Sequence, residues 1–448
     1  MRKSISVVVI AVAGFVIATA AFGIEVPLNY EKYDENQQTF RPFGAMRPQM
    51  LPEPPEGEWK LPDPVGDKPL YTVIKLADSD RLSVIDRQKP DDPYYNRIYF
   101  DSNGNGDMTD DPAVDGTIRK FNDDYYNVTF PVIDTEIKVD GAVLPYSFMP
   151  QVSGMGFEKA GDVEITAENI RRYVNCYFEI NCSYSAEFQM DGRSYRVMLG
   201  DTDGNGRFND RFSIPENFRS ISRMPVYAQG DQFYISGTGN IDFTDRQVCG
   251  DFVMVNGKLY EVEISTARGK LTLTEVTEGL VPLKLAMETE RLALYSEDGE
   301  HCLNMYKPES TVLIPAGNYR LLSYQAFRDD EQGDRWRLIA GGSTESPVVS
   351  VEQNNGAVLE FGEPFVPIVE TQNVGRGSSG EGASDLPLLF NVEGTGRELL
   401  TELIHMSGTK TKIPLSKTRG RENRPKEPSY RIVKSDGEIV AVGSFEYG

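Results

Sequence analysis

Residues 174–190 read VNCYFEINCSYSAEFQM, and this stretch decides the fold class. Apolar and small side chains occupy every second position, and the positions between them are mostly polar. This alternation places the apolar side chains on one face of an extended strand, whereas a helix would repeat them every three or four residues. The apolar set is Val174, Cys176, Phe178, Ile180, Cys182, Tyr184, Ala186, Phe188 and Met190. The pattern predicts a long strand with one buried face.

The same alternation recurs from Leu70 onward, and tight turns separate its segments. Four dipeptides are of the kind that closes two-residue hairpins, because both central positions of such turns need positive φ. They are Asp140-Gly141, Asp191-Gly192, Asn256-Gly257 and Asp436-Gly437. Helical periodicity is scarce, and only residues 167–173 could form about two turns. We therefore predict an all-β protein made of successive antiparallel β units with tight hairpins.

Composition divides the chain into an arm and three β units. Residues 41–67 are rich in Pro and Gly, which favours an extended arm over a helix or a central strand. The run PAGNYRL at 315–321 resembles one strand of the immunoglobulin-like sandwiches appended to many exported proteins, such as carboxypeptidase-regulatory-like domains. This resemblance implies a C-terminal immunoglobulin-like sandwich. The predicted divisions are a Pro-rich arm over 24–64, β units over 65–160 and 161–280 with one acidic loop each, and an immunoglobulin-like domain over 281–448.

The first residues are typical of a secretory signal. A basic start, Met1-Arg2-Lys3, precedes an apolar run over residues 5–17, and Ala18-Thr19-Ala20 supplies the small residues that signal peptidase reads. Residues 1–23 are therefore predicted to be a signal peptide, with an uncleaved anchor as the alternative. No later stretch is apolar enough to cross a bilayer. We expect an exported chain, periplasmic or extracellular, with no transmembrane segment after cleavage of the signal.

The chain is strongly acidic. It holds 46 Lys and Arg residues against 68 Asp and Glu residues, which gives a net charge of −22 at pH 7. Such a charge repels nucleic acid and anionic membranes, and it attracts divalent cations. Nucleic acid is excluded as a partner on this ground. The expected partner is an extracellular or envelope ligand, either a polysaccharide or a protein.

Two acidic loops follow one pattern. The first, residues 101–111, reads DSNGNGDMTDD, and the second, residues 201–210, reads DTDGNGRFND. Oxygen-bearing side chains stand at alternate positions around two glycines, as a tight loop requires if it is to offer Ca²⁺ six to eight oxygen ligands. The apolar Met108 and Phe208 would anchor the loops in the core. The alternative is that both loops are Asx-rich turns without a metal.

In these residues the loops resemble EF-hand loops and, more closely, the loops of dockerins and thrombospondin type 3 repeats. The resemblance implies two Ca²⁺ ions per chain, with position 7 using its backbone carbonyl. An EF-hand closes with a bidentate Glu at position 12, where this chain has Pro112 or Phe212. Asp110, Asp111 and Asp210 are the available substitutes. The candidate ligands are Asp101, Asn103, Asn105, Asp107, Thr109, Asp110 and Asp111 in the first loop, and Asp201, Asp203, Asn205, Arg207, Asn209 and Asp210 in the second.

A strand is expected to run directly into each loop, over residues 97–100 and 195–199. This expectation argues against a helix–loop–helix switch of the EF-hand type, because no helix would be present to move. Catalytic motifs are also scarce. His301 and His405 are the only histidines and have no metal-ligand spacing, and no G-x-S-x-G elbow is present. No catalytic residue is predicted, although a pair of carboxylates for glycoside hydrolysis has no local signature.

Four cysteines permit three disulfide pairings: Cys176, Cys182, Cys249 and Cys302. Six residues of straight strand span roughly 20 Å, far beyond the limit of about 7 Å between bonded α-carbons. Cys176 and Cys182 therefore cannot bond to each other if the strand over 174–190 is straight. Buried free thiols are the alternative to any bridge.

The sequence leads to one functional hypothesis and two alternatives. The first is an exported calcium-binding structural or binding protein of the cell envelope or the secreted milieu. The arrangement resembles exported bacterial β proteins of unassigned activity, so the resemblance implies a fold and no reaction. The alternatives are a calcium-dependent enzyme on polysaccharide and a carbohydrate- or peptide-recognition module. Two acids converging in a pocket outside the loops would favour the enzyme, and a Tyr-rich face would favour sugar binding.

Overall fold

The all-β prediction is confirmed. The computed structural model describes residues 23–34, 40–121, 125–155, 166, 168–215, 224–353, 356–371, 388–406 and 411–446. These residues form strands and loops, apart from the helical turn α2 (Ile170–Tyr173) and the 3-10 turn η3 (Phe243–Asp245). The predicted signal peptide lies outside the described residues, except for Gly23. No helix within the described ranges has the length and apolar character needed to cross a membrane.

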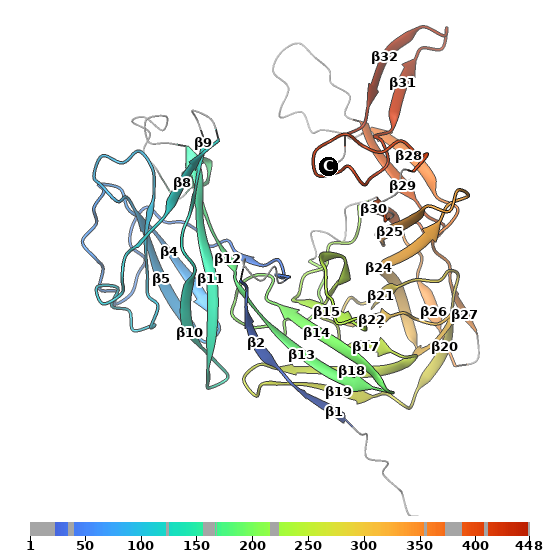
Figure 1. Cartoon of the computed structure of the whole chain (residues 1–448), viewed down its shortest axis with the longest axis horizontal. Coiled ribbons are helices and arrows are strands. Elements are labelled where there is room, and N and C mark those ends of the chain that lie inside the picture. The colour runs from blue at the N-terminus through green and yellow to red at the C-terminus, as the bar shows by residue number, and fades with distance from the viewer. Residues whose placement is uncertain are drawn as a thin grey trace, which may run out of the picture.

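Two sheets make up an N-terminal lobe, which Figure 1 shows at the left. The four-stranded sheet runs in the order β4 (Leu70–Leu76), β5 (Ser79–Asp86), β6 (Arg97–Phe100) and β7 (Val114–Asp115). The six-stranded sheet runs in the order β3 (Ala45–Met46), β12 (Val174–Ile180), β11 (Ala142–Met155), β9 (Tyr125–Thr129) and β8 (Thr117–Lys120), and β10 (Ile133–Val139) also pairs with β11.

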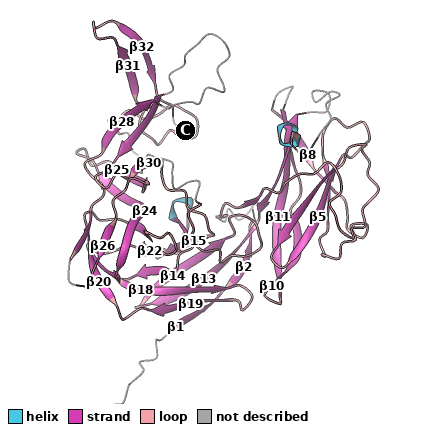
Figure 2. Ribbon diagram, turned by 180° about the vertical axis from the view of Figure 1, so that it is seen from behind, coloured by secondary structure: helices cyan, strands magenta, loops and turns pink. Residues whose placement is uncertain are grey.

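The other sheets form a larger, curved body (Figures 1 and 2). Its five-stranded sheet has the order β16 (Arg246–Val248), β15 (Gln232–Ser236), β14 (Arg193–Gly200), β13 (Cys182–Met190) and β2 (Asn29–Lys32). The largest sheet has the order β1 (Gly23–Pro27), β19 (Lys270–Glu275), β18 (Lys258–Ser265), β17 (Phe252–Val255), β22 (Cys302–Tyr306), β21 (Arg291–Ser296), β24 (Gly317–Asp329), β25 (Arg335–Gly341), β30 (Leu399–His405), β29 (Leu388–Glu393) and β28 (Val366–Thr371). Strand β26 (Val349–Val351) also pairs with β24.

Two smaller sheets complete the body. A three-stranded sheet has the order β23 (Thr311–Pro315), β20 (Leu280–Leu285) and β27 (Ala357–Leu359). It packs on the largest sheet through a buried cluster that includes Leu283, Leu294 and Leu321. A hairpin of β31 (Ser429–Val433) and β32 (Ile439–Ser444) extends from the far end of the body, as Figure 1 shows. Most pairings are antiparallel, as predicted, but β17–β22 and β20–β27 are parallel.

Residues 174–190 are two strands rather than one. The alternation of buried positions holds on both sides of Asn181, but β12 belongs to the six-stranded sheet and β13 to the five-stranded sheet. The backbone of Asn181 makes the transition, because its N–H donates to the carbonyl of Ser147 and its carbonyl accepts from Tyr33. The argument that Cys176 and Cys182 are too far apart to form a disulfide assumed one straight strand, so it no longer applies. All four cysteines are buried, and none of them forms a disulfide.

Three of the four predicted hairpin turns have positive φ at both central positions. The φ angles are 49° and 83° at Asp140-Gly141, 50° and 76° at Asp191-Gly192, and 52° and 74° at Asn256-Gly257. At Asp436-Gly437 only the glycine has positive φ, at 90°. The loop there is longer, since the Lys434 N–H donates to the carbonyl of Glu438 at 2.8 Å. This turn therefore differs from the predicted two-residue type.

Strand pairing crosses the predicted divisions of the chain. Strands β1, β2 and β3 lie within the Pro-rich arm, and they pair with β19, β13 and β12 respectively. Strand β12, from the second predicted unit, pairs along its length with β11 from the first. One core cluster extends from Phe100 through Phe148 and Phe178 to Phe233 and so joins the lobe to the body. The two acidic loops lie within this interlocked framework.

Candidate metal centre

Both acidic loops have the same backbone design. Each follows directly from a strand, β6 or β14, as predicted. The carboxylate at position 1 is buried and accepts N–H groups from positions 4 and 6. In the first loop Asp101 accepts from Gly104 at 2.7 Å and Gly106 at 3.3 Å, and in the second Asp201 accepts from Gly204 at 2.7 Å and Gly206 at 2.8 Å. These four glycines have φ between 72° and 84°, a region that favours glycine.

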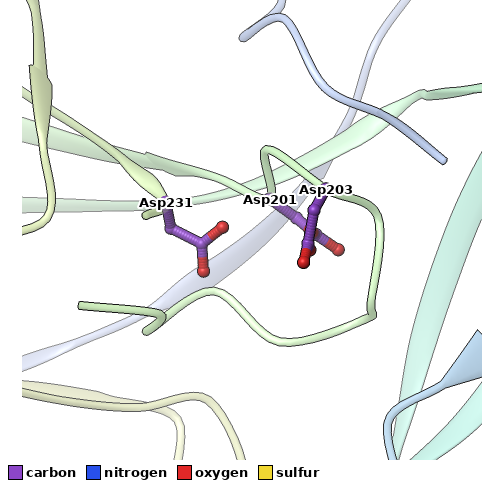
Figure 3. A group of neighbouring side chains, drawn as sticks. All are labelled: Asp201, Asp203 and Asp231. Carbon is purple, nitrogen blue, oxygen red and sulfur yellow. The ribbon is translucent and has the colours of Figure 1, made fainter. Parts of the chain in front are cut away.

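Three carboxylates converge at the second loop. Asp201, Asp203 and Asp231 each offer an oxygen, and these oxygens all lie within 4.8 Å of one another. Figure 3 shows Asp231 facing Asp201 and Asp203 from a separate segment, next to the start of β15. Asp231 accepts the N–H of Thr202 at 2.9 Å with one oxygen and the N–H of Asp210 at 2.8 Å with the other. It therefore holds the two ends of the loop together from outside the loop.

This cluster gathers three acidic groups, and two of them are buried. Asp201 and Asp231 are 1 % exposed, whereas Asp203 is exposed. Burial raises the pKa of Asp201 well above the ordinary range, although the Tyr146 hydroxyl donates to it at 2.7 Å. Burial and the charge of Asp201 raise the pKa of Asp231 in the same direction. Among the described residues no basic side chain bonds to these three carboxylates. A divalent cation would supply the missing positive charge.

The remaining candidates of the second loop have other partners. The Asn205 amide oxygen accepts the N–H of Arg207 at 2.7 Å, and its nitrogen donates to Asp210. The Arg207 side chain turns away and pairs with Asp78 at 2.6 Å and with Asp140 on a neighbouring hairpin. The Asn209 amide faces the carbonyl of Ile264 at 3.5 Å. The structure therefore does not bring the side chains of Arg207 and Asn209 to the cluster, and Asn205 and Asp210 border it.

In the first loop, Asp111 takes the closing position that Asp231 has in the second. One oxygen of Asp111 accepts the N–H of Ser102 at 3.2 Å, which corresponds to the bond from Asp231 to Thr202. The other oxygen is buried and has no hydrogen-bond partner in the described part of the chain. A buried guanidinium, Arg81, lies close by and donates to the carbonyl of Asp101 at 3.2 Å. The first loop therefore has an internal cation that the second loop lacks.

The side-chain amide oxygens of the first loop accept hydrogen bonds from the backbone of the same loop. The side-chain oxygens of Asn103 and Asn105 accept N–H groups two residues further on, at 3.0 and 2.6 Å. Their amide nitrogens donate to Asp110 at 3.3 and 2.9 Å. An amide oxygen has two lone pairs, so each can still accept a cation. Among the described residues, however, Asp101, Asp110 and Asp111 do not bring three carboxylate oxygens within 4.8 Å of one another, as Asp201, Asp203 and Asp231 do.

Asp107 and Thr109 face the Pro-rich arm instead. The Asp107 carboxylate pairs with Lys60 at 2.6 Å and accepts the Thr109 N–H at 3.0 Å, and these bonds lower the pKa of Asp107 to about 2. The backbone of Lys60 also donates to the carbonyl of Gly106 and accepts the N–H of Met108. Met108 is buried, as predicted, and so is Phe208 in the second loop. The first loop therefore holds the arm against the lobe.

The second loop joins the lobe to the body. The carbonyl of Asn205 accepts the N–H of Ala77 in the β4–β5 turn at 2.6 Å, and the carbonyl of Thr202 accepts the N–H of Ala45 at 3.1 Å. Its anchor, Phe208, packs edge-on against Tyr146 of β11 and Tyr184 of β13, with ring centroids 6.2 and 4.9 Å apart. An ion in this loop would therefore stabilise the contact between the two parts of the protein.

Sequence reasoning missed Asp231. The residue stands alone before an apolar strand, and such an Asp has the same local pattern as any surface residue at a strand start. Only the pairing of β14 with β15 brings it beside the loop. The signal that could have found it was the missing position-12 ligand, which requires a donor from elsewhere in the fold. Comparison with known proteins finds no matching family model, no matching curated protein and no matching solved structure.

Proposed function

We propose that this protein is an exported calcium-binding structural or binding protein, in which two Ca²⁺ ions stabilise the junctions of a β framework. The observation that carries the proposal is the cluster of Asp201, Asp203 and Asp231. Two of these carboxyl groups are buried together with no basic partner among the described residues, and their ionisation is costly unless a cation joins them. Oxygen-only donors on a tight loop suit Ca²⁺, because it accepts flexible oxygen coordination at about 2.4 Å.

The second loop is the stronger of the two proposed sites. Its closing carboxylate and its position-1 carboxylate face each other, and Arg207 is engaged elsewhere. The first loop offers Asp101, Asp110, Asp111 and the two amide oxygens, and the unpartnered oxygen of Asp111 supports a cation there. Arg81 already offsets part of the charge of that loop, so we propose weaker binding at the first site.

The position of the loops supports a structural role for the ions. The second loop contacts both the lobe and the body, and the first contacts the arm and the lobe. Strands rather than helices lead into both loops. Binding would therefore hold strand ends in place without the helix movement that exposes an apolar groove in sensor EF-hands. We include in this proposal an immunoglobulin-like module over 281–448, supported by the PAGNYRL run, which passes from β23 in one layer to β24 in the other.

The enzyme alternative receives less support from the cavity beside β12. That cavity measures about 560 Å³ and contains one carboxylate, Glu179, which pairs with Arg41 at 2.8 Å. Glycoside hydrolysis by the usual route needs two carboxyl groups flanking the scissile bond. A single neutralised carboxylate cannot fill both roles.

Calorimetric titration tests the proposal. Protein treated with a chelator and then dialysed should bind two Ca²⁺ ions, with dissociation constants on the order of 0.1–1 mM, as in extracellular modules. Mg²⁺ at the same concentrations is the control, because it demands a smaller octahedral site and should produce little heat. Circular dichroism should keep its β-type spectrum, and a hydrophobic dye should not bind on calcium addition. Absence of calcium heat, or an equal response to Mg²⁺, would reject the proposal.

A further inference from the structure

The outward face of β12 lines a cavity beneath the Pro-rich arm. The alternation that buries Cys176 and Phe178 turns Asn175, Tyr177 and Glu179 outward. The segment around β3 passes over this face, because β3 pairs with β12 at Met46 and Phe178. The resulting cavity of about 560 Å³ also receives Phe43 and Arg47 from the arm and Arg171 from α2. Its volume lies within the range of small-molecule sites.

The cavity is basic within a strongly acidic protein. Its one carboxylate, Glu179, is neutralised by Arg41 at 2.8 Å. Arg47 and Arg171 are exposed, and neither side chain has an ion-pair or hydrogen-bond partner among the described residues. The chain has a net charge of −22. Two guanidinium groups that line one cavity without a partner among the described residues therefore mark a site for an anion.

The neutral lining indicates which kind of anion. Phe43 is 53 % exposed, so its ring is available to a ligand. The Tyr177 ring is held in place, because its hydroxyl donates to Gln151 at 2.6 Å. Asn175 and Ser153 add an amide and a hydroxyl that can bond to ligand hydroxyl groups. Aromatic rings, neutral hydrogen-bonding groups and a carboxylate-binding fork together match a sugar ring that bears a carboxylate.

An acidic peptide fits this site less well. Peptides that add to a β-sheet need an unpaired strand edge. In the described part of the chain β12 leaves only residues 174–177 as such an edge, because β11 pairs with one side over 174–180 and β3 pairs with the other side at Phe178 and Glu179. We propose that the cavity binds a uronic acid residue of an acidic polysaccharide, with Arg47 and Arg171 on the carboxylate and Phe43 against the ring. This site is separate from the calcium loops, and the proposal does not depend on them.

Titration calorimetry with trigalacturonate tests the assignment, in the presence of a chelator so that calcium cannot bridge the sugar to the acidic loops. The parent chain should bind this probe, and its affinity should fall as salt increases. Arg47→Gln and Arg171→Gln should each weaken binding by at least tenfold, and Phe43→Ala by several-fold. Arg268→Gln is the matched control, since Arg268 is an exposed arginine on the β18–β19 turn and its side chain has no partner among the described residues. Circular dichroism checks that every variant keeps the parent fold.

Two further probes decide the chemical class. The fully methyl-esterified trigalacturonate has the same rings and no charge, so it should bind at least tenfold more weakly. A hexaglutamate peptide carries the carboxylates without the rings and should also bind more weakly. The proposal is overturned if the ester or the peptide binds as well as the acid, if Arg47→Gln and Arg171→Gln leave affinity unchanged, if binding appears only with calcium, or if the acid does not bind at all.

Discussion

Replacing Asp231 by Asn should remove the calcium response of the second loop. The substitution keeps the shape of the side chain and removes the charge that faces Asp201 within 4.8 Å. In the calcium-free protein two effects oppose each other. The amide can accept only one of the N–H groups of Thr202 and Asp210, at a cost of about 1–3 kcal/mol, while relief of the buried charge has a similar size and opposite sign. The stability of the calcium-free variant is therefore expected to stay near that of the parent.

The parent and Asp231→Asn should differ in how much calcium stabilises them. For a site with a dissociation constant of 0.1–1 mM, 10 mM Ca²⁺ adds about 1.4–2.7 kcal/mol to the free energy of unfolding. A loss of one carboxylate ligand that weakens binding tenfold would lower this increment by about 1 kcal/mol. At the size of this chain we expect that loss to lower the calcium-induced rise in melting temperature by about 1 °C. Differential scanning calorimetry at pH 7.5, with chelator and with 10 mM calcium, measures the difference.

Asp436→Asn is the control for this experiment. Asp436 lies in the β31–β32 turn, where it accepts the N–H of Glu438 at 3.0 Å, far from either loop. Its calcium increment should equal that of the parent. In calorimetric titration Asp231→Asn should keep the weaker first site and lose the second or weaken it at least tenfold. If Asp231→Asn instead retains the full calcium increment and both binding events, Asp231 is not a ligand and the proposed cluster is wrong.

Three other predictions follow from the same contacts. Asp111→Asn should abolish binding at the first loop alone, because it neutralises the buried oxygen that has no partner, and titration should then count one ion in place of two. In chelator, the free energy of unfolding should fall as pH rises from about 4 toward 8. Burial raises the folded-state pKa of Asp201 and Asp231, so the unfolded chain releases those protons at lower pH than the folded chain does. Denaturant titrations across this range should show the decrease, and saturating calcium should make it smaller. Hydrogen exchange at the amides of Ala45 and Ala77 should be faster in chelator than in calcium, since both donate to the second loop, whereas the Val276 amide, which donates to Leu259, should not change; equal protection at all three amides in both conditions would contradict the junction role.

Much of the fold could be predicted from local sequence patterns. The alternation over 174–190 correctly placed Cys176, Phe178 and Tyr184 in the core, and the Asp-Gly and Asn-Gly turns located the hairpins. These features depend on neighbours within a few residues, so the sequence expresses them directly. The break at Asn181 could not be foreseen, because its cause is hydrogen bonding to Ser147 and Tyr33, which are distant along the chain.

The candidate site likewise has features that the sequence predicts and features that depend on distant parts of the chain. The positive φ of Gly106 and Gly206 was predicted, since it follows from loop geometry, and the ligand role of the position-1 aspartates stays a prediction. Asp231 was missed because its contact with the loop comes from strand pairing. The side chains of Arg207 and Asn209 have other partners, and the use of the position-7 backbone carbonyl as a ligand stays a prediction. The basic cavity beside β12 was also missed, because Arg47 and Arg171 come to line one cavity only when the arm crosses the sheet.

The pairing of β1 with β19 has a consequence for the way in which the chain can fold. Gly23 lies opposite Thr274, and Lys32 of β2 lies opposite Cys182. A chain that emerges from a ribosome or a translocation channel with its N-terminus first presents β1 long before its partner strand exists. The first strand must therefore wait unpaired until residue 275 has appeared, and its docking closes a very long loop. During that interval the exposed strand is open to a chaperone or to pairing with another chain.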